Sequence, residues 1–413
     1  MNVLRQSLKL RIQRIERSRT RRSERTDKAN DAQRELRPDH RVLSTDAWRP
    51  AGVAGRREMR VAIFGAGSVA LANAWYLANA GHDVRIWSAF DAEREAIGSA
   101  GVRAEGSMQG TVRVTVASDP RSCLDGASLA MIAAPAFAHQ ALMAAAAPHL
   151  AAGQDVLVHP VTGLSSLLLS RMLKDRGVKP TIIDVSTSLF TARRTGAGSV
   201  RILKFKTTVD VATLPACRVG DAVKRLEPLF GKRFRTQANT LAISLNNHNP
   251  VYHVAPILCN LSRVDRNESW IFWDCITPNV ARLVKFVDEE RLAVAHHFGM
   301  PEVTVEDYFR EAHGAEGRNL HEIFRFMTEQ LQGPMGPQEF KHRFITEDVP
   351  YALVFYRSLG RLAGIAMPIT DSLIALASAL YDCDFTRTGH TLERLGLQSL
   401  SSGDILEVTL TGF

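Results

Sequence analysis

Short apolar runs alternate with helix-forming segments along the first half of the chain. The clearest of these runs lie at residues 60–64, 84–87, 129–134, 155–159 and 181–185. Uninterrupted apolar runs of this length are typical of strands that are buried on both faces of a parallel sheet, and the alanine-rich segments between them favour helices. The alternation predicts a doubly wound α/β domain over residues 58–238.

From about residue 239 the apolar positions recur at helical spacing instead. Thr277-Pro278 opens a segment that ends at Gly299. Its apolar face consists of Val280, Leu283, Val284, Val287 and Val294. Further helices are expected from Asp348 to Gly364 and from Thr370 to Tyr381, because an N-terminal Asp or Thr and a terminal Gly are common helix boundaries. Residues 239–413 are predicted to form an all-α domain.

The basic character of the chain is confined to its first 57 residues. They hold sixteen Lys/Arg against seven Asp/Glu, which leaves thirty-five against thirty-six for residues 58–413. The folded body is therefore neutral, and a nucleic-acid partner is not expected for it. Residues 1–57 are predicted to be a disordered extension, and Met59 stands as an alternative first residue; a targeting or RNA-binding segment is the competing interpretation.

The remaining composition indicates a soluble, cytoplasmic protein. The chain has 413 residues, of which 45% are hydrophobic, and no apolar run approaches the length that spans a bilayer. Its five cysteines are an odd number and form no Cys-x-x-Cys pair, so neither a disulfide framework nor a zinc cluster is indicated. His296-His297 and His321-Glu322 have no third ligand at metal spacing, and no metal site is predicted.

A glycine motif follows the first predicted strand. Gly65-x-Gly67-x-x-Ala70 stands between this strand and a helix-forming stretch, and a second strand begins at Val84. This is the Rossmann fingerprint for a dinucleotide, in which the glycines allow a tight turn and a close approach to the pyrophosphate. The predicted cofactor contacts are Gly65, Ala66, Gly67, Ser68 and Val69, together with Ser88 and, on the nicotinamide side, Pro135.

The choice between NADP and NAD depends on the end of the second strand. An Asp or Glu usually stands there to bind the adenosine ribose, and this chain has Ser88. Ser88 with Arg85 or Arg94 modestly favours NADP, because an arginine neutralises a 2′-phosphate. The alternative is NAD, with Asp91 or Glu93 as the ribose ligand after a longer loop.

Two polar stretches in the second half carry the candidate chemistry. One is Leu245-Asn246-Asn247-His248-Asn249-Pro250-Val251-Tyr252-His253, and the other is Arg343-Phe344-Ile345-Thr346-Glu347-Asp348-Val349-Pro350-Tyr351. Together they resemble the octopine/nopaline dehydrogenase (opine dehydrogenase) family, from residue 60 to about 405. Glu-Asp-Val-Pro-Tyr is the most specific part of the resemblance.

The resemblance implies both a reaction and a set of residues. Such enzymes condense an amino acid with a 2-oxo acid and reduce the resulting imine with NAD(P)H, or run the reverse reaction. His253 and Asp348 match the catalytic pair, and Arg343 matches the residue that binds the oxo-acid carboxylate. Histidine exchanges protons near neutral pH, and guanidinium pairs well with carboxylate. Asn247 and Tyr351 are further candidate substrate contacts.

Each assignment has a structural alternative. His253 has apolar neighbours and is also compatible with a core histidine, Asp348 with a helix N-cap, and Arg343 with a solvated basic face. The alternative function is a reductase of the ketopantoate reductase or glycerol-3-phosphate dehydrogenase type. Those enzymes rely on lysine, and here Lys204 and Lys206 precede the helical half. A non-enzymatic dinucleotide sensor is the last alternative, and a homodimer is compatible with each.

Overall fold

The computed structural model describes residues 58–331 and 333–413, so the predicted basic extension, residues 1–57, lies outside the described residues. The strands are β1 (Arg60–Phe64), β2 (Asp83–Trp87), β3 (Val102–Gly106), β4 (Gly110–Val112), β5 (Thr115–Val116), β6 (Leu129–Ile132), β7 (Asp155–Val158), β8 (Ile182–Val185), β9 (Phe190–Gly196), β10 (Ser199–Phe205), β11 (Val209–Leu214) and β12 (Phe234–Thr236). The helices of the first half are α2 (Ser68–Asn79), α3 (Asp91–Ala100), α4 (Pro120–Leu124), α5 (Ala136–Ala146), α6 (Ser166–Leu173) and α7 (Val219–Phe230).

The larger sheet has the strand order β12-β11-β8-β7-β6-β1-β2-β5. The strands from β8 to β5 are parallel, and β11 pairs antiparallel with β8. Strand β2 pairs with one edge of β1, and β6, which comes later in the chain, pairs with its other edge. The strand order therefore reverses between β1 and β6. A doubly wound sheet leaves its ligand crevice at such a reversal, at the carboxyl ends of the strands. The predicted α/β fold is confirmed, with one antiparallel junction added.

Helix α2, which follows the glycine motif, is enclosed by protein. Its residues from Ala70 to Leu77 are all buried, because a second sheet of order β4-β3-β10-β9 covers the face that the larger sheet leaves free. The ring of Tyr76 packs on Phe205 of β10, with 4.8 Å between the ring centroids. A helix that is apolar all round needs this double cover. The four-stranded sheet was not predicted.

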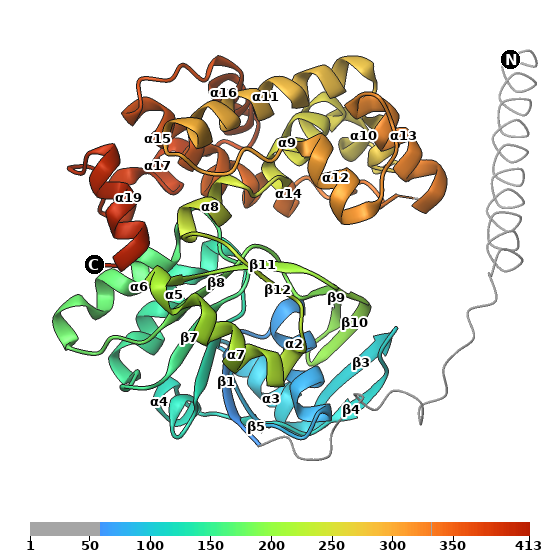
Figure 1. Ribbon diagram of the computed structural model, residues 1–413. Coiled ribbons are helices and arrows are strands. Elements are labelled where there is room, and N and C mark those ends of the chain that lie inside the picture. The colour runs from blue at the N-terminus through green and yellow to red at the C-terminus, as the bar shows by residue number, and fades with distance from the viewer. Residues whose placement is uncertain (1–57, 332) are drawn as a thin grey trace, which may run out of the picture. The chain divides into compact units, whose positions relative to one another are not determined.

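The second half consists of helices, drawn from yellow to red in Figure 1. They are α8 (Thr240–Leu245), α9 (Asn249–Cys259), α10 (Leu261–Asp265), α11 (Pro278–His297), α12 (Val305–His313), α13 (Leu320–Leu331), α14 (Arg343–Thr346), the π-helical turn η5 (Val349–Leu353), α15 (Val354–Leu362), α16 (Pro368–Leu380), α17 (Phe385–Thr388), α18 (Leu392–Leu395) and α19 (Ser402–Thr411). The predicted all-α half is confirmed. Among the described residues, no helix is both long and apolar enough to cross a membrane.

One predicted helix is interrupted. The segment expected from Asp348 to Gly364 begins with the π-helical turn η5 and becomes α-helical only at Val354. Pro350 has no N–H to donate to a carbonyl one turn earlier, which disturbs the regular hydrogen-bond ladder at this point. Single π-helical turns of this kind occur often at functional sites. A smaller correction is that α16 begins at Pro368 rather than at Thr370.

Asp184 of β8 connects the sheet with the helical half. Its side chain is fully buried, and its Oδ2 atom accepts hydrogen bonds from the hydroxyls of Ser166 (2.6 Å) and Thr240. These two residues begin α6 and α8, so one carboxyl group holds both helix starts against the same strand. Burial raises the pKa of Asp184 to about 6. The helical half is thus fixed near the carboxyl end of β8.

Candidate active site

The glycine motif forms a turn that leaves room for a ligand. Gly65 has a φ of +123°, and a Cβ atom there would lie 2.6 Å from the Ala133 carbonyl oxygen, so only glycine fits. A Cβ atom on Gly67 would meet no protein atom within 4 Å. Gly67 is also the N-cap of α2, whose first turn contains no acidic residue. Free N–H groups beside open space suit a pyrophosphate.

The rest of the predicted cofactor contacts line the same edge of the sheet. Ser68 and Val69 are partly exposed in the first turn of α2, whereas Ala66 is buried beneath it. Pro135 follows β6 and is the N-cap of α5, on the other side of the strand reversal. The loop residues and Pro135 therefore flank the crevice, which fits a dinucleotide lying across it.

The end of β2 contains a carboxylate after all. Ser88 is buried, and its hydroxyl donates to Oε2 of Glu93 over 2.5 Å. Arg194 of β9 pairs with the other oxygen of this carboxylate at 2.6 Å. Arg94 bonds the Ser88 carbonyl oxygen and the Asp91 carboxylate. The first turn of α3 thus brings the Glu93 carboxylate, five residues further along the chain than Ser88, to the end of β2.

Arg85 does not reach this strand end. Its guanidinium donates to the Ser122 carbonyl oxygen (2.8 Å) and lies 3.7 Å from the Asp125 carboxylate. Both partners belong to α4 and its C-terminus, since side chains alternate along β2. The sequence expectation that Arg85 neutralises a 2′-phosphate is therefore corrected, and of the two predicted arginines only Arg94 stays near Ser88.

The two candidate catalytic residues are hydrogen-bonded to each other. Nδ1 of His253 lies 2.7 Å from Oδ2 of Asp348, and their side chains are 9% and 7% exposed. His253 is in the second turn of α9, and Asp348 immediately precedes η5. Asp348 makes no capping hydrogen bond with its side chain, so the N-cap alternative fails. A carboxylate that accepts from Nδ1 leaves Nε2 as the atom that exchanges a proton.

Aromatic rings hold the imidazole in place. Phe344 of α14 stacks on His253 with 3.7 Å between the ring centroids and 19° between the planes, and Tyr252 meets it edge-on. Burial lowers the pKa of His253, and the nearby Arg343 guanidinium lowers it further, although the Asp348 hydrogen bond and charge act in the opposite direction. Burial outweighs the carboxylate, so the free imidazole is neutral at neutral pH.

Arg343 is the exposed cation beside this pair. Its side chain is 59% exposed, and its Nε atom lies 3.5 Å from Oε2 of Glu347. Glu347 is buried, and its Oε1 atom accepts a hydrogen bond from the Ala136 N–H (3.0 Å) at the start of α5. Burial raises the pKa of Glu347. This glutamate therefore links Arg343 to the sheet side of the crevice, a role that the sequence analysis missed although Glu347 is part of the recognised string.

The structure gives the other predicted substrate contacts mainly local roles. Oδ1 of Asn247 accepts from the N–H of Asn249 (3.2 Å), which is a turn at the start of α9. Its carbonyl oxygen accepts from the Tyr356 hydroxyl (2.7 Å). Tyr351 lies on η5 with its ring edge-on to His390, 4.8 Å between centroids. The substrate-binding roles of Asn247 and Tyr351 stay predictions.

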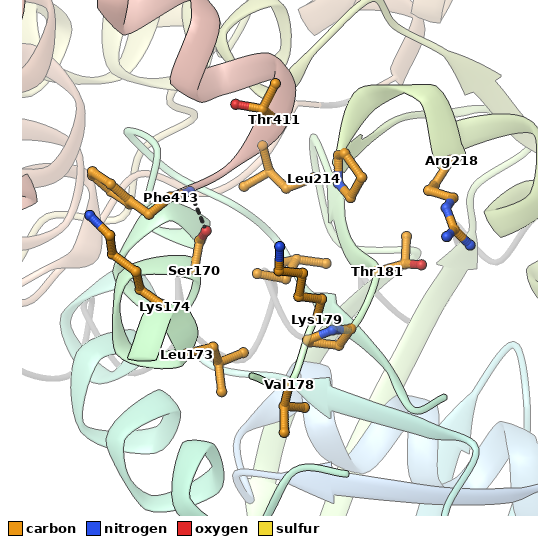
Figure 2. Close-up of a pocket in the computed structure, with 13 residues that line it drawn as sticks. Ser170, Leu173, Lys174, Val178, Lys179, Thr181, Leu214, Arg218, Thr411 and Phe413 are labelled. Atoms are coloured by element: carbon orange, nitrogen blue, oxygen red, sulfur yellow. Dashed lines mark hydrogen bonds between the residues drawn. The ribbon is translucent and has the colours of Figure 1, made fainter. Parts of the chain in front are cut away.

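A hollow elsewhere on the molecule does not contain these residues. It has a volume of about 260 Å³ and lies at the amino end of β8, where Ile182 pairs with Leu214 of β11 (Figure 2). Lys174, Lys179 and Arg218 line it, and the Phe413 N–H bonds the Ser170 hydroxyl at 2.9 Å. The glycine motif and His253 lie toward the opposite, carboxyl edge of the sheet. This hollow is therefore not the candidate active site.

Several enzyme families combine an α/β half with an all-α half, and comparison with known proteins distinguishes among them. Residues 236–381 match the family model for the α-helical domain of NAD/NADP octopine/nopaline dehydrogenase. The opine dehydrogenase of Arthrobacter sp. (strain 1C) is 31% identical over 350 residues, which cover 83% of this chain and 97% of that protein. The chain belongs to the octopine/nopaline dehydrogenase family. A second relative, Protein ocs of Agrobacterium tumefaciens (strain Ach5), is 28% identical over a match that covers 84% of this chain and 98% of that protein.

Solved structures agree with the family at the level of the fold. Octopine dehydrogenase, solved with NADH and L-arginine, matches with a TM-score of 0.72 and 20% identity. The match covers 84% of this chain and 98% of that chain. A ketopantoate reductase from Ralstonia eutropha JMP134 has a TM-score of 0.59 and covers 78% of this chain. Residues 61–215 also match the family model for ketopantoate reductase PanE/ApbA. The ketopantoate reductase family model thus matches the cofactor half alone, while the helical half matches the model of the octopine/nopaline enzymes.

The family assignment confirms the family resemblance, the two-part fold and the class of enzyme that were predicted from the sequence. The chain is an NAD(P)-dependent oxidoreductase that acts on CH–NH donors, with a nicotinamide cofactor and small-molecule substrates. The roles of individual site residues are not decided by these likenesses. They depend on the geometry described above.

Proposed function

We propose that this enzyme condenses an amino acid with a 2-oxo acid and reduces the imine to an N-(carboxyalkyl)amino acid, with His253 and Asp348 as the catalytic pair. The 2.7 Å contact between these two buried side chains is the observation that carries the proposal. It joins α9 to the start of η5, which are the two stretches that resemble the family.

Each residue of the pair has a distinct task. Asp348 holds the imidazole in one orientation and stabilises its protonated form. His253 uses Nε2 to give a proton to the reacting centre during condensation and to take one away in the reverse reaction. NAD(P)H, when bound across the glycine motif, supplies the hydride. Phe344 excludes water from one face of the imidazole.

Arg343 binds the carboxylate of the oxo acid in this proposal. Its exposed guanidinium stands beside the catalytic pair, and its fork matches a planar carboxylate with two parallel hydrogen bonds. Glu347 positions the arginine, since it contacts Nε and is itself held by the Ala136 N–H. Octopine dehydrogenase has been solved with NADH and pyruvate, which makes pyruvate the first oxo acid to test.

NADH is our proposed coenzyme, although Ser88 in the sequence modestly favoured NADPH. The Glu93 carboxylate stands 2.5 Å from the Ser88 hydroxyl, where it can accept hydrogen bonds from the ribose hydroxyls. A 2′-phosphate would meet this negative charge, and Arg85 is turned toward α4. The two arginines at this strand end, Arg94 and Arg194, already pair with Asp91 and Glu93. Octopine dehydrogenase has likewise been solved with NADH.

Three predictions from the sequence are retained as proposals. The boundary between the two halves lies near residue 238, between β12 and α8. The enzyme acts in the cytoplasm. A homodimer is compatible with the fold.

The experiment is a matrix of oxo acids and amino acids with each coenzyme, followed by the loss of NADH or NADPH absorbance. The proposal expects loss only when both an oxo acid and an amino acid are present. Loss with an oxo acid alone would indicate a hydroxyacid dehydrogenase of the alternative type. No loss with any pair would also contradict the proposed condensation.

A further inference from the structure

Lys206 places an ammonium group at the carboxyl edge of the larger sheet. It follows β10, and its Nζ atom donates to the Thr187 hydroxyl over 2.6 Å. Thr187 lies just past the end of β8, so the amine stands on the edge where doubly wound folds bind ligands. The N–H of Lys206 bonds the Leu189 carbonyl oxygen (2.9 Å), which fixes the backbone beneath it.

This ammonium has no carboxylate partner within residues 58–331 and 333–413. It forms none of the ion pairs of the described chain, and the Thr187 hydroxyl uses one of its three donors. A half-buried cation without a counter-charge is costly, because burial removes water that is not replaced by an anion. Burial lowers the pKa of Lys206 to about 8, helped by the repulsion of Arg343 and Lys204. Such a group at a ligand-binding edge is suited to an anionic ligand.

Electrostatic repulsion also links the Lys206 ammonium to basic groups of the helical half. Arg343 of α14 helps to lower the pKa of Lys206, and the charge of Lys206 in turn helps to lower the pKa of His313 on α12 and of His159 at the end of β7. The Lys206 ammonium is therefore within electrostatic reach of α14 and α12 of the helical half. Its charge adds to that of Arg343 in one electropositive region.

The strand order separates Lys206 from the coenzyme. The glycine motif follows β1, and Pro135 on the nicotinamide side follows β6. Lys206 is anchored beside β8, two strands beyond β6 and away from the adenosine side at β2. Its ligand is thus on the substrate side of the crevice.

We propose that Lys206 binds the α-carboxylate of the amino-acid substrate, while Arg343 binds the carboxylate of the oxo acid. This inference rests on the proposed function, because condensation brings two carboxylates into one site and the product keeps both. One cation on each half of the chain, Lys206 at the edge of the sheet and Arg343 on α14, matches this pair of negative charges.

The test compares an amino acid with the amine that lacks its carboxylate. L-Arginine and agmatine are the first pair, since octopine dehydrogenase has been solved with each; if the substrate matrix selects another amino acid, it is used with its own decarboxylated amine. Dissociation constants are measured by titration of the enzyme–NADH complex through coenzyme fluorescence. Lys206→Met should raise the dissociation constant of the amino acid at least about tenfold and that of the amine less than about threefold.

Two variants control for structural damage. Lys204→Met removes an exposed lysine two residues away and should leave both constants within about twofold. Lys206→Arg retains the charge and should recover part of the preference for the amino acid. The dissociation constant of NADH should stay unchanged in every variant.

Each contrary result has a distinct meaning. Equal weakening of amino acid and amine in Lys206→Met would make the lysine structural and overturn the inference. If Lys206→Met weakened the binding of pyruvate more than that of acetaldehyde, Lys206 would bind the oxo-acid carboxylate instead. If it weakened the binding of NADH alone, Lys206 would be a coenzyme ligand. Either result overturns the assignment. A wild-type enzyme that condenses no amino acid would contradict the proposed function itself and this inference with it.

Discussion

His253 and Asp348 are 95 residues apart in the sequence, and their side chains meet at 2.7 Å in the interior of the helical half. Asp348 stands between the short helix α14 and the π-helical turn that begins at Val349. Pro350 interrupts the regular ladder at the same place. The irregular turn at this proline is therefore adjacent to the proposed catalytic pair.

His253→Asn should lower kcat by about 10²- to 10⁴-fold, since this is the usual contribution of general acid–base catalysis. The dissociation constant of the dinucleotide should be unchanged, because the coenzyme is held by the other half. Asp348→Asn should lower kcat in the same direction, and the double variant should be about as slow as the slower single one if the two act as a unit. Near-normal turnover in His253→Asn would contradict the pair.

The pH dependence of the reverse reaction should report on the imidazole. Oxidation of the product needs neutral His253 as the base, and burial lowers its pKa from 6.5, so kcat/KM should rise with pH along a limb centred below 6.5. Asp348→Asn removes the group that raises this pKa, and the limb should move to still lower pH. A limb that moves upward in Asp348→Asn would mean that another group titrates.

Arg343→Lys should raise KM for the oxo acid at least about tenfold, because lysine keeps the charge and loses the fork. The KM of the amino acid should move less, and coenzyme binding should not move. Arg361→Lys, an exposed arginine of α15, is the matched control and should behave as the wild type. If Arg343→Lys weakened only the binding of the dinucleotide, Arg343 would be a coenzyme ligand and not a substrate ligand.

Glu93→Gln should weaken the binding of NADH by about tenfold, because a charged acceptor contributes roughly 1.5–3 kcal/mol to hydrogen bonds with the ribose hydroxyls, and it should strengthen the binding of NADPH, because the charge that opposes a 2′-phosphate is removed. Fluorescence titration of both coenzymes measures this. Glu105→Gln, on β3, is a control acid away from the end of β2. Tighter binding of NADPH than of NADH by the wild type would contradict the proposed coenzyme and favour the NADP prediction made from Ser88.

Local sequence signals predicted the parts of the fold that depend on local physics. The glycine motif, the buried strands and Thr277-Pro278 at the start of α11 each follow from turn geometry, apolar runs or helix capping. The four-stranded sheet was missed because β9 and β10 are rich in charged residues on their exposed face and lack an apolar run. Its pairing of β10 with β3 joins residues about a hundred positions apart.

The candidate site shows the same division. The family resemblance supplied His253, Asp348 and Arg343, and the structure brings them together. Glu93 was only an alternative, because the bend from β2 into α3 that returns it to Ser88 has no signature in the sequence. Lys206 was set aside since it precedes the helical half, yet the turn after β10 carries it to the edge of β8.

The most direct test of the account follows both halves of the product at once. The enzyme is given pyruvate, an amino acid labelled with ¹⁵N and NADH deuterated at the transferred position, and the product is examined by mass spectrometry. The account predicts a single species that contains ¹⁵N, both carboxylates and one deuterium at the former carbonyl carbon of the oxo acid. Deuterated lactate without ¹⁵N would contradict it.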